Sequence, residues 1–162
     1  MAKKPQQKND IVSLAGNRRA FHDYAILRRM EAGIQLTGTE VKSCRAKNIQ
    51  LQEGFVTVER REAWLRNVHI AEYDFGNRFN HDVNRMRRLL LHRSEIDALI
   101  RHLAVKGHAV VPLSFYLKQG LVKVELGLAQ GKHDYDRRED IKNRESEREV
   151  RRVMATFNKK SQ

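Results

Sequence analysis

The sequence predicts a mainly β domain with added helices, a small antiparallel β-barrel, followed by a basic C-terminal tail that is disordered or helical. About six short segments alternate apolar and polar residues, as strands do. Two further segments have the caps and spacing of helices. The 162 residues, 40% of them apolar, suffice for one modest core. Antiparallel strands with inserted helices are typical of a barrel resembling the oligonucleotide-binding fold.

Composition divides the chain into three parts. Residues 1–16 are expected to form a flexible basic arm. Lysines stand there among Gln, Asn and Pro residues, and such residues bury too little apolar surface to offset the conformational entropy lost on ordering. Residues 17–130 hold the segments with strand and helix patterns and form the β-barrel domain. Residues 131–162 form a charged C-terminal tail.

Strands account for the first half of the domain. Residues 21–36 alternate apolar and polar side chains in part, with a break at residues 32–33, which predicts two strands or one bent strand. Residues 55–70 predict two more strands, joined by a tight charged turn at residues 59–62.

The second half contains a loop, a helix and two strands. Residues 71–88 are polar and charged and predict a long exposed loop, and loops of this length usually bind something or are disordered. A helix is expected over residues 95–106, where apolar residues recur at helical spacing between Ser94, which can cap the helix, and a terminal Gly. Residues 108–118 and 121–131 predict strands linked by a Gln-Gly turn.

A short cationic helix is predicted over residues 39–47. Thr37 and Glu40 have the spacing of a capping box, in which the Thr oxygen accepts a free backbone N–H and the Glu carboxylate bonds back to the backbone of the first residue. Lys42 and Arg45 lie three apart and therefore share one face of the helix. The helix either presents these cations rigidly to a polyanion or is a solvated surface helix.

The charge of the chain points to the class of partner. The net charge of +12 and the pI near 10.2 favour a polyanion, nucleic acid first and an anionic membrane second. A membrane is disfavoured, because no apolar run approaches the roughly 20 residues of a bilayer span and the first residues lack the apolar core of a signal peptide. The single cysteine, Cys44, agrees with a reducing compartment, so a cytoplasmic protein is expected.

Enzymatic motifs are missing from the sequence. It carries no phosphate-binding glycine loop, nucleophile elbow, paired-cysteine metal site or two-histidine metalloprotease motif, so neither a metal nor another cofactor is expected. Two adjacent pairs, His22-Asp23 and His81-Asp82, leave a metal-dependent ribonuclease as an alternative, although neither has a nucleophile or third ligand at a recognisable spacing. A non-enzymatic binding protein is favoured, and a generic single-strand RNA binder is the other alternative.

The tail has a helical charge pattern with little apolar surface. Opposite charges recur at helix-supporting spacings, and Val150, Val153, Met154 and Phe157 form one narrow apolar stripe. Such a segment is either a solvated helix or disordered tail that keeps the protein soluble, or a segment that folds on a polyanionic partner.

Six segments and the charged tail carry a family resemblance. The segments read NRRAFHDYAI, EAGIQLTGTEVKSCRA, NVHIAEY, GNRFNHD, LLLHRSEID and VVPLSFYLKQGLVKVELGLAQGKHDYDRRED. In order and spacing they resemble the SsrA-binding protein (SmpB) family of bacteria over residues 17–157, with residues 38–45 and 131–138 the most specific parts. The resemblance implies a barrel similar to the oligonucleotide-binding type and a function in trans-translation, in which transfer-messenger RNA (tmRNA), which resembles a tRNA without an anticodon arm, is brought to ribosomes stalled on mRNA lacking a stop codon.

The resemblance also implies which residues contact tmRNA. The family's contact positions fall on Asn17, Arg18, His22, Glu31, Lys42 and Arg45, with Glu40 capping the helix. With neighbouring polar and cationic residues, the predicted RNA-binding set is Asn17, Arg18, Arg19, His22, Glu31, Thr39, Glu40, Lys42, Ser43, Arg45, Arg85 and Arg87.

By the same resemblance, the tail lies in the empty mRNA channel and substitutes for codon–anticodon pairing. The family's Asp-Lys-Arg motif appears here as Asp-Arg-Arg after an aromatic residue, and the predicted ribosome-contacting set is Lys132, Tyr135, Asp136, Arg137, Arg138, Lys142, Arg144, Arg151, Val153 and Met154. The implied partners are tmRNA, small-subunit ribosomal RNA at the decoding centre and mRNA channel, and elongation factor Tu indirectly through aminoacylated tmRNA. The protein is expected to be a monomer.

The chain departs from the family pattern at a few positions. Arg28 and Arg29 stand where acidic residues are common, which raises the local positive charge. Cys44 stands where Leu or Ile is usual. Neither departure touches the capping box or the Asp-Arg-Arg motif.

Overall fold

The structure, a computed structural model, describes residues 10–76, 80–132 and 134–160, and within the last range the side chains of residues 134–137 and 158–160 lie outside the described part. Contacts divide the chain into two units. The first ends at Gly131 and the second begins at Lys132.

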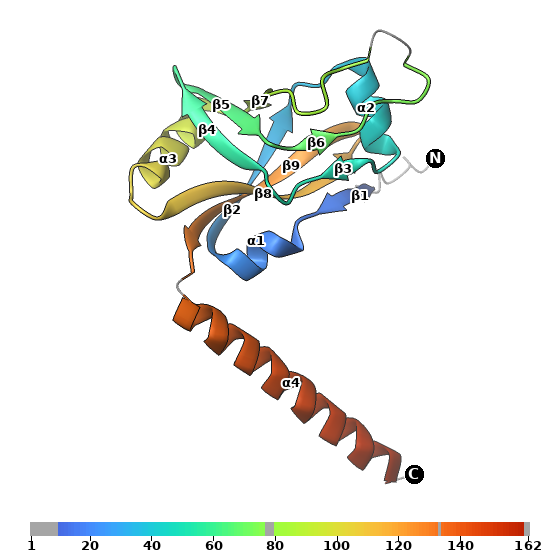
Figure 1. Ribbon diagram of the computed structural model, residues 1–162, viewed down its shortest axis with the longest axis vertical. Helices are drawn as coiled ribbons and strands as arrows, with labels where there is room; N and C mark the ends of the chain where they lie inside the picture. Colours follow the sequence, from blue (N-terminus) through green and yellow to red (C-terminus); the bar gives the residue numbers. More distant parts are fainter. Residues whose placement is uncertain (1–9, 77–79, 133, 161–162) are drawn as a thin grey trace, which may run out of the picture. The chain divides into compact units, whose positions relative to one another are not determined.

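The first unit is built on an antiparallel sheet of seven strands in the order β1-β8-β9-β2-β7-β5-β4 (Figure 1). Its strands are β1 (Ile11–Gly16), β2 (Tyr24–Ile34), β4 (Phe55–Glu59), β5 (Glu62–Arg66), β7 (Arg87–Leu90), β8 (His108–Lys118) and β9 (Leu121–Gly131). A second, two-stranded sheet pairs β3 (Ile49–Gln50) with β6 (His69–Ile70). The helices are α1 (Arg18–Asp23), α2 (Gly38–Arg45) and α3 (Arg93–Leu103).

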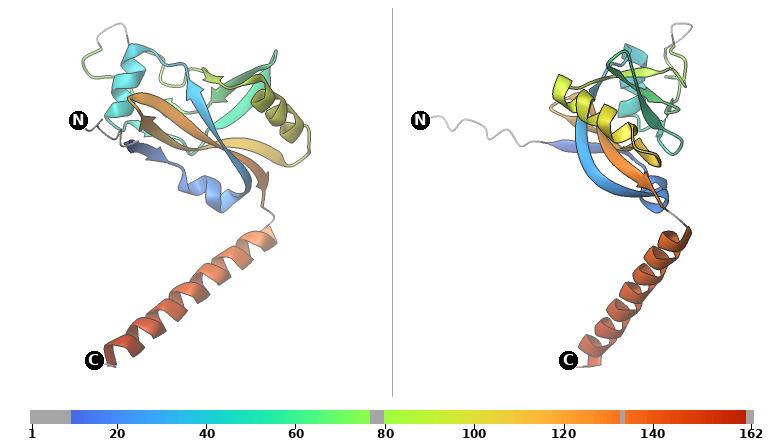
Figure 2. Two further views of the ribbon diagram at one scale, coloured as in Figure 1. Left: turned by 180° about the vertical axis from the view of Figure 1, so that it is seen from behind. Right: turned by 90° about the vertical axis from the view of Figure 1, so that its left-hand side faces the viewer.

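The strand order confirms the predicted mainly β, antiparallel architecture. Every neighbouring pair in the large sheet is antiparallel. The edge strands β1 and β4 do not pair with each other among the described residues, so the barrel is not closed. Figure 2 shows the curved sheet from two further directions, with α3 against its β4 and β8 strands.

Two tight turns join the long strand pairs, as the sequence predicts. Arg60 and Arg61 connect β4 to β5 with φ of +50° and +61°, and Gln119 and Gly120 connect β8 to β9 with φ of +53° and +77°. Two consecutive left-handed residues match the right-handed twist of the flanking strands. Both hairpin registers therefore follow from local turn geometry.

Apolar side chains pack on both faces of β8 and β9. The main core cluster includes Phe115, Val124 and Leu126, each fully buried. A smaller cluster beneath α1 contains Val111 and Leu113 with Ala20 and Ala129. This explains why these strands read as nearly continuous apolar runs.

The boundaries of several elements differ from the prediction. Residues 11–16, assigned to the flexible arm, form β1 and pair with β8, because the polar residues before them dominate the composition of the window. Residues 18–23, of which residues 21–23 were predicted to be strand, form α1, and the Asn17 side chain caps this helix by accepting a hydrogen bond from the N–H of Ala20. Residues 87–90, of which the first two were assigned to the loop, form β7 between β2 and β5.

The predicted helices are confirmed with shifted ends. Helix α2 covers Gly38–Arg45, and α3 covers Arg93–Leu103. The N-cap of α3 is His92 rather than Ser94, because Glu95 accepts a hydrogen bond from the His92 N–H at 2.8 Å. The segment at residues 21–36 contains one long strand, β2, with a bulge between Ile26 and Arg28.

The second unit is one helix, α4 (Asp134–Lys160), so the helical form of the tail prediction is the one observed. The side chains of its apolar stripe, Val150, Val153, Met154 and Phe157, are 51–69% exposed. Lys132 forms an ion pair with Asp140, and Asp140 consequently has a pKa below its ordinary value, chiefly through that hydrogen bond. No helix in the described part of the chain is long and apolar enough to cross a membrane.

The division at residue 131 predicts that the first unit folds without the second. Every member of the two apolar core clusters lies at or before Ala129. A chain that ends after Gly131 should therefore melt within about 3 °C of the full chain. Thermal unfolding followed by circular dichroism measures this, and a chain that ends after Lys123, which lacks most of β9, is the control that should not fold. An unfolded 1–131 chain would contradict the division.

Candidate nucleic-acid interface

Helix α2 is fixed at its start by the predicted capping box. The Thr37 hydroxyl accepts a hydrogen bond from the Glu40 N–H at 3.5 Å, and the Glu40 carboxylate accepts one from the Thr37 N–H at 2.9 Å. These bonds satisfy backbone donors that a helix start otherwise leaves free. The helix therefore needs little apolar surface to hold its first turn.

The Glu40 carboxylate also accepts hydrogen bonds from two arginines, Arg85 in the loop between β6 and β7 and Arg87 at the start of β7. Arg87 donates from Nε at 2.9 Å, and Arg85 donates from two guanidinium nitrogens at 3.2 and 2.8 Å. Arg87 further donates to the carbonyls of Val68 at 2.7 Å and Val83 at 3.1 Å. Glu40 and Arg87 are both fully buried, so the pair joins α2 to β7 inside the protein.

Burial and charge act in opposite directions on this pair. Burial alone raises the pKa of Glu40, but hydrogen bonds from Arg85 and Thr37 and the charge of Arg87 outweigh it, so the pKa of Glu40 lies below its ordinary value. Burial also lowers the pKa of Arg87, and the Glu40 charge partly offsets that effect. Nearby Cys44 is buried, which raises the pKa of its thiol to about 12 and leaves it protonated and inert.

Four residues of the predicted RNA-binding set are buried. Arg87 is fully buried and donates hydrogen bonds to Glu40 and two backbone carbonyls, so the fold does not present its guanidinium on the surface as the predicted RNA contact requires. Glu40 caps α2 as expected but is not exposed to RNA. The Ser43 hydroxyl donates to the Ala71 carbonyl at 2.6 Å, and the Asn17 amide donates to the Pro112 carbonyl at 2.9 Å. These four side chains form hydrogen bonds inside the protein and do not face the solvent.

The exposed part of the α2 region combines cations with aromatic rings. Lys42 and Arg45 are exposed, and the Lys42 Nζ lies 5.4 Å from the centroid of the Tyr73 ring. Arg85 is about one-third exposed beside its contact with Glu40. Thr39 is partly buried and contacts His81 Nδ1 at 2.9 Å. The cations therefore lie on a helix whose orientation the buried pair holds.

The remaining predicted residues of the first unit lie elsewhere on the sheet. Arg18, Arg19 and His22 are exposed on α1, which lies apart from α2 in both Figure 1 and Figure 2. Arg19 forms ion pairs with Asp23 at 3.3 Å and Glu53 at 2.6 Å. The fold thus brings the α2 cations together with Arg85 but not with those of α1.

Glu31 faces outward from β2 and is partnered by side chains of β8. The Tyr116 hydroxyl donates to its carboxylate, and Lys118 Nζ lies 3.3 Å away. The hydrogen bond from Tyr116, followed by that from Lys118, lowers the pKa of Glu31 despite some burial. Glu31 is therefore an ionised hydrogen-bond acceptor on an exposed strand.

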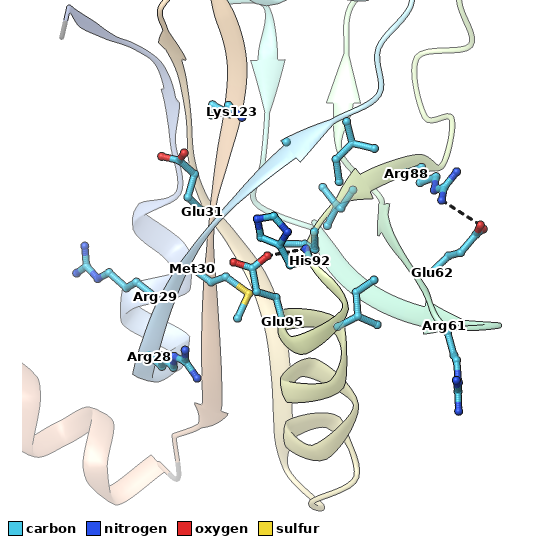
Figure 3. Close-up of a pocket in the computed structure, with 15 residues that line it drawn as sticks. Arg28, Arg29, Met30, Glu31, Arg61, Glu62, Arg88, His92, Glu95 and Lys123 are labelled. Atoms are coloured by element: carbon cyan, nitrogen blue, oxygen red, sulfur yellow. Dashed lines mark hydrogen bonds and ion pairs between the residues drawn. The ribbon is translucent and has the colours of Figure 1, made fainter.

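A separate groove gathers arginines that the sequence analysis did not bring together. Arg28, Arg29, Arg61 and Arg88 line a cavity of about 660 Å³ between β2, β7, the β4–β5 turn and the start of α3 (Figure 3). Arg88 pairs with Glu62 at 3.2 Å. Two of the four are the residues that depart from the family pattern, so they add to the positive charge here rather than beside α2.

The two His-Asp pairs have different surroundings. The Ile70 carbonyl accepts from His81 Nε2 at 2.8 Å, so His81 Nδ1 in the neutral ring accepts from the Thr39 hydroxyl, and both nitrogens of this buried ring are occupied. His22 instead contacts Asp23 at 2.9 Å on the surface, a bond that lowers the pKa of Asp23. Over the described ranges, no group of three or more His, Cys, Asp or Glu side chains is arranged to hold a metal ion.

The predicted tail residues lie along α4. Arg138, Lys142, Arg144, Arg151, Val153 and Met154 are exposed, whereas Lys132 pairs with Asp140. Tyr135, Asp136 and Arg137 belong to the first turn of the helix, and their side chains lie outside the described part. Their predicted contacts stay predictions.

Comparisons with known proteins agree on one family. The family model described as SmpB protein matches residues 14–156. The SsrA-binding protein of Levilactobacillus brevis is 54% identical over 157 residues, covering 97% of this chain and 100% of the relative, and that of Streptococcus uberis is 53% identical over 145 residues, covering 90% and 94%. A solved structure described as "tmRNA-SmpB: a journey to the center of the bacterial ribosome" matches with a TM-score of 0.64 and 46% identity, covering 74% of this chain and 85% of that one.

The buried pair gives a stability prediction. Glu40→Gln keeps a capping residue but leaves the Arg87 guanidinium buried without its charge partner, so the free energy of unfolding at pH 7 should fall by about 3–5 kcal/mol. Urea unfolding measures this. The control is Glu59→Gln, which removes the exposed pair with Arg66 and should cost less than about 1 kcal/mol.

The same variant should change the response to acid. Because the folded-state pKa of Glu40 is below its ordinary value of 4.5, its ionisation contributes stability that is present above about pH 4.5 and is lost as the pH falls through the folded-state pKa. The parent should therefore lose more stability than Glu40→Gln on acidification from about pH 5 to pH 3. Equal losses in the two proteins would show that Glu40 carries no linked proton.

Proposed function

The chain belongs to the SmpB family of SsrA-binding proteins, and from that premise we propose that it binds tmRNA and delivers it to stalled ribosomes for trans-translation. It acts as an RNA-binding adaptor and not as an enzyme. The match to a structure of tmRNA with SmpB on the bacterial ribosome supports tmRNA and the ribosome as its partners.

The observation that carries the proposal is the rigid cationic helix. Lys42 and Arg45 are exposed on α2, whose start is held by the Thr37–Glu40 box and whose position is held by the buried Glu40–Arg87 pair. Cations on a helix that is already ordered lose less conformational entropy on binding phosphates than cations on a flexible loop. We propose that this helix contacts the tmRNA backbone, with Arg18 and His22 of α1 and Glu31 of β2 as further contacts.

The tail has the surface expected of a segment that binds ribosomal RNA. Its described arginines and its apolar stripe are exposed along one helix. We propose that α4 lies in the mRNA channel of the small subunit, with the Asp-Arg-Arg motif near the decoding centre. Elongation factor Tu is then reached only through aminoacylated tmRNA, and the protein acts as a monomer in the cytoplasm.

A salt titration tests the α2 contact. Replacing Lys42 and Arg45 by Ala should weaken tmRNA binding and reduce the slope of log K against log[salt] by about one to two units, because each lost phosphate contact removes one released counterion. Filter binding at several salt concentrations gives both values. The matched control neutralises Arg101 and Lys106, which are exposed on and just after α3, and should leave the slope nearer to that of the parent.

The same assay separates the competing functions. A generic single-strand binder would bind an unrelated RNA of equal length as tightly as tmRNA, whereas an adaptor should prefer tmRNA. Recovery of intact RNA after incubation with Mg²⁺ is expected, and cleavage would indicate a ribonuclease.

An unchanged slope of log K against log[salt] in the Lys42/Arg45 variant would contradict the proposed contact between α2 and tmRNA.

A further inference from the structure

Phe75 is the most exposed large apolar side chain in the described part of the chain, with 80% of its surface in water. It lies in the loop between β6 and β7, which runs beside α2 in Figure 1 and Figure 2. A single exposed apolar residue is ordinary on a protein surface. The position of Phe75 differs because the turn that carries it is held by several hydrogen bonds.

The turn is closed by one side chain. Asn80 accepts a hydrogen bond from the Tyr73 N–H at 3.0 Å and donates one to the Tyr73 carbonyl at 2.7 Å. The Gly76 N–H donates to the same carbonyl at 2.8 Å. A Cβ at Gly76 would lie 2.7 Å from the Asn80 amide nitrogen, so glycine is what allows this amide to sit in place. These hydrogen bonds hold the backbone on both sides of Phe75.

Phe75 is continuous with the cationic face of α2. Its ring meets the Tyr73 ring edge-on, with centroids 5.6 Å apart and planes at 65°. The Tyr73 ring in turn lies under Lys42, whose Nζ is 5.4 Å from the centroid, and exposed Arg45 is on the same helix. An exposed aromatic surface thus adjoins cations, which is the chemistry that holds a nucleobase together with its phosphate.

The charges of the loop decide which part of a nucleotide fits Phe75. Glu72 and Asp74 are exposed on either side of Tyr73. Two carboxylates repel a phosphate but leave an uncharged base unaffected. The base is therefore the part that reaches the Phe75 ring, while the phosphates stay on the α2 side.

We propose that Phe75 is a stacking platform for one unpaired base of the RNA whose phosphates contact Lys42 and Arg45. The assignment rests on the proposed function, because tmRNA supplies that RNA, and it adds a base contact to an interface otherwise made of phosphate contacts. The Tyr73 ring supports Phe75 from its edge, and Asn80 keeps the turn closed.

Binding of tmRNA to Phe75 variants tests the assignment. Phe75→Ala should weaken binding by about 10-fold, in the range measured for loss of one stacked base. The slope of log K against log[salt] should not change, because the ring carries no charge, whereas the Lys42/Arg45 variant should change it. Phe75→Trp should restore the affinity, and Phe75→Leu, which is apolar but not aromatic, should not.

Controls separate stacking from other effects. Leu121→Ala removes another exposed apolar side chain, 62% exposed at the β8–β9 turn, and should leave tmRNA binding unchanged. Phe75→Ala should keep the melting temperature of the parent, because the ring is exposed. In Phe75→Trp, emission in excess of that from Trp64, the only tryptophan of the parent, should be quenched when tmRNA binds.

Each failure has its own meaning. If the parent does not bind tmRNA, the proposed function is wrong. If the parent binds tmRNA and Phe75→Ala binds it equally well, the stacking proposal is wrong, because the ring then contributes nothing to RNA binding. Full affinity in Phe75→Leu would also overturn stacking, since a general apolar contact would then be sufficient. A changed salt slope in Phe75→Ala would show that the ring acts through the cations instead.

Discussion

The carboxylate of Glu40 and the guanidinium of Arg87 are both removed from water, and the position of α2 depends on their contact. Burying an ion pair gains little stability over an apolar pair of the same size, but leaving one member buried alone is costly. The pair therefore acts mainly as a constraint. Conformations that separate α2 from β7 would leave one charge buried without its partner, which is unfavourable. Through its bonds to Val68 and Val83, Arg87 extends this constraint to the residue before β6 and to the β6–β7 loop.

Hydrogen bonds also link α2 to described residues of the loop that follows β6. Ser43 of α2 bonds to the Ala71 carbonyl, Thr39 bonds to His81, and Asn80 closes the turn at Tyr73. Thr39, Ser43, Asn80 and His81 are thus committed to internal hydrogen bonds. Lys42, Arg45 and Phe75 remain exposed, and the fold places the backbone that carries them on neighbouring segments.

The positive charge of the chain is spread over several surfaces. The net charge of +12 predicts a polyanionic partner, but it does not distinguish the cations of α2 from those of α1, the groove at Arg28 and Arg61, or α4. Each surface has different neighbours. Arg19 and Arg88 are paired with carboxylates, whereas Lys42 lies over the ring of Tyr73, which in turn contacts Phe75. Identical residue types therefore have different environments on one protein.

Short-range features were determined by the sequence itself. The capping box at Thr37 and Glu40 and the turn at Gln119 and Gly120 involve residues at most three positions apart, so their geometry follows from local chemistry. The long apolar runs of β8 and β9 likewise predict strands because both faces are buried. The family and the function follow from ordered motifs over nearly the whole chain.

Only the tertiary structure decided which polar residues face water. Arg87 and Lys42 look equally available in the sequence, yet Arg87 is buried because β7 pairs between β2 and β5 and turns this side chain toward Glu40, 47 positions earlier. Residues 11–16 become a strand only because β8, about a hundred positions later, supplies hydrogen-bond partners. The contact between Lys42 and Tyr73 likewise joins residues from separate segments. Burial and pairing over such separations depend on the packing of the whole sheet, which no local pattern of residues contains.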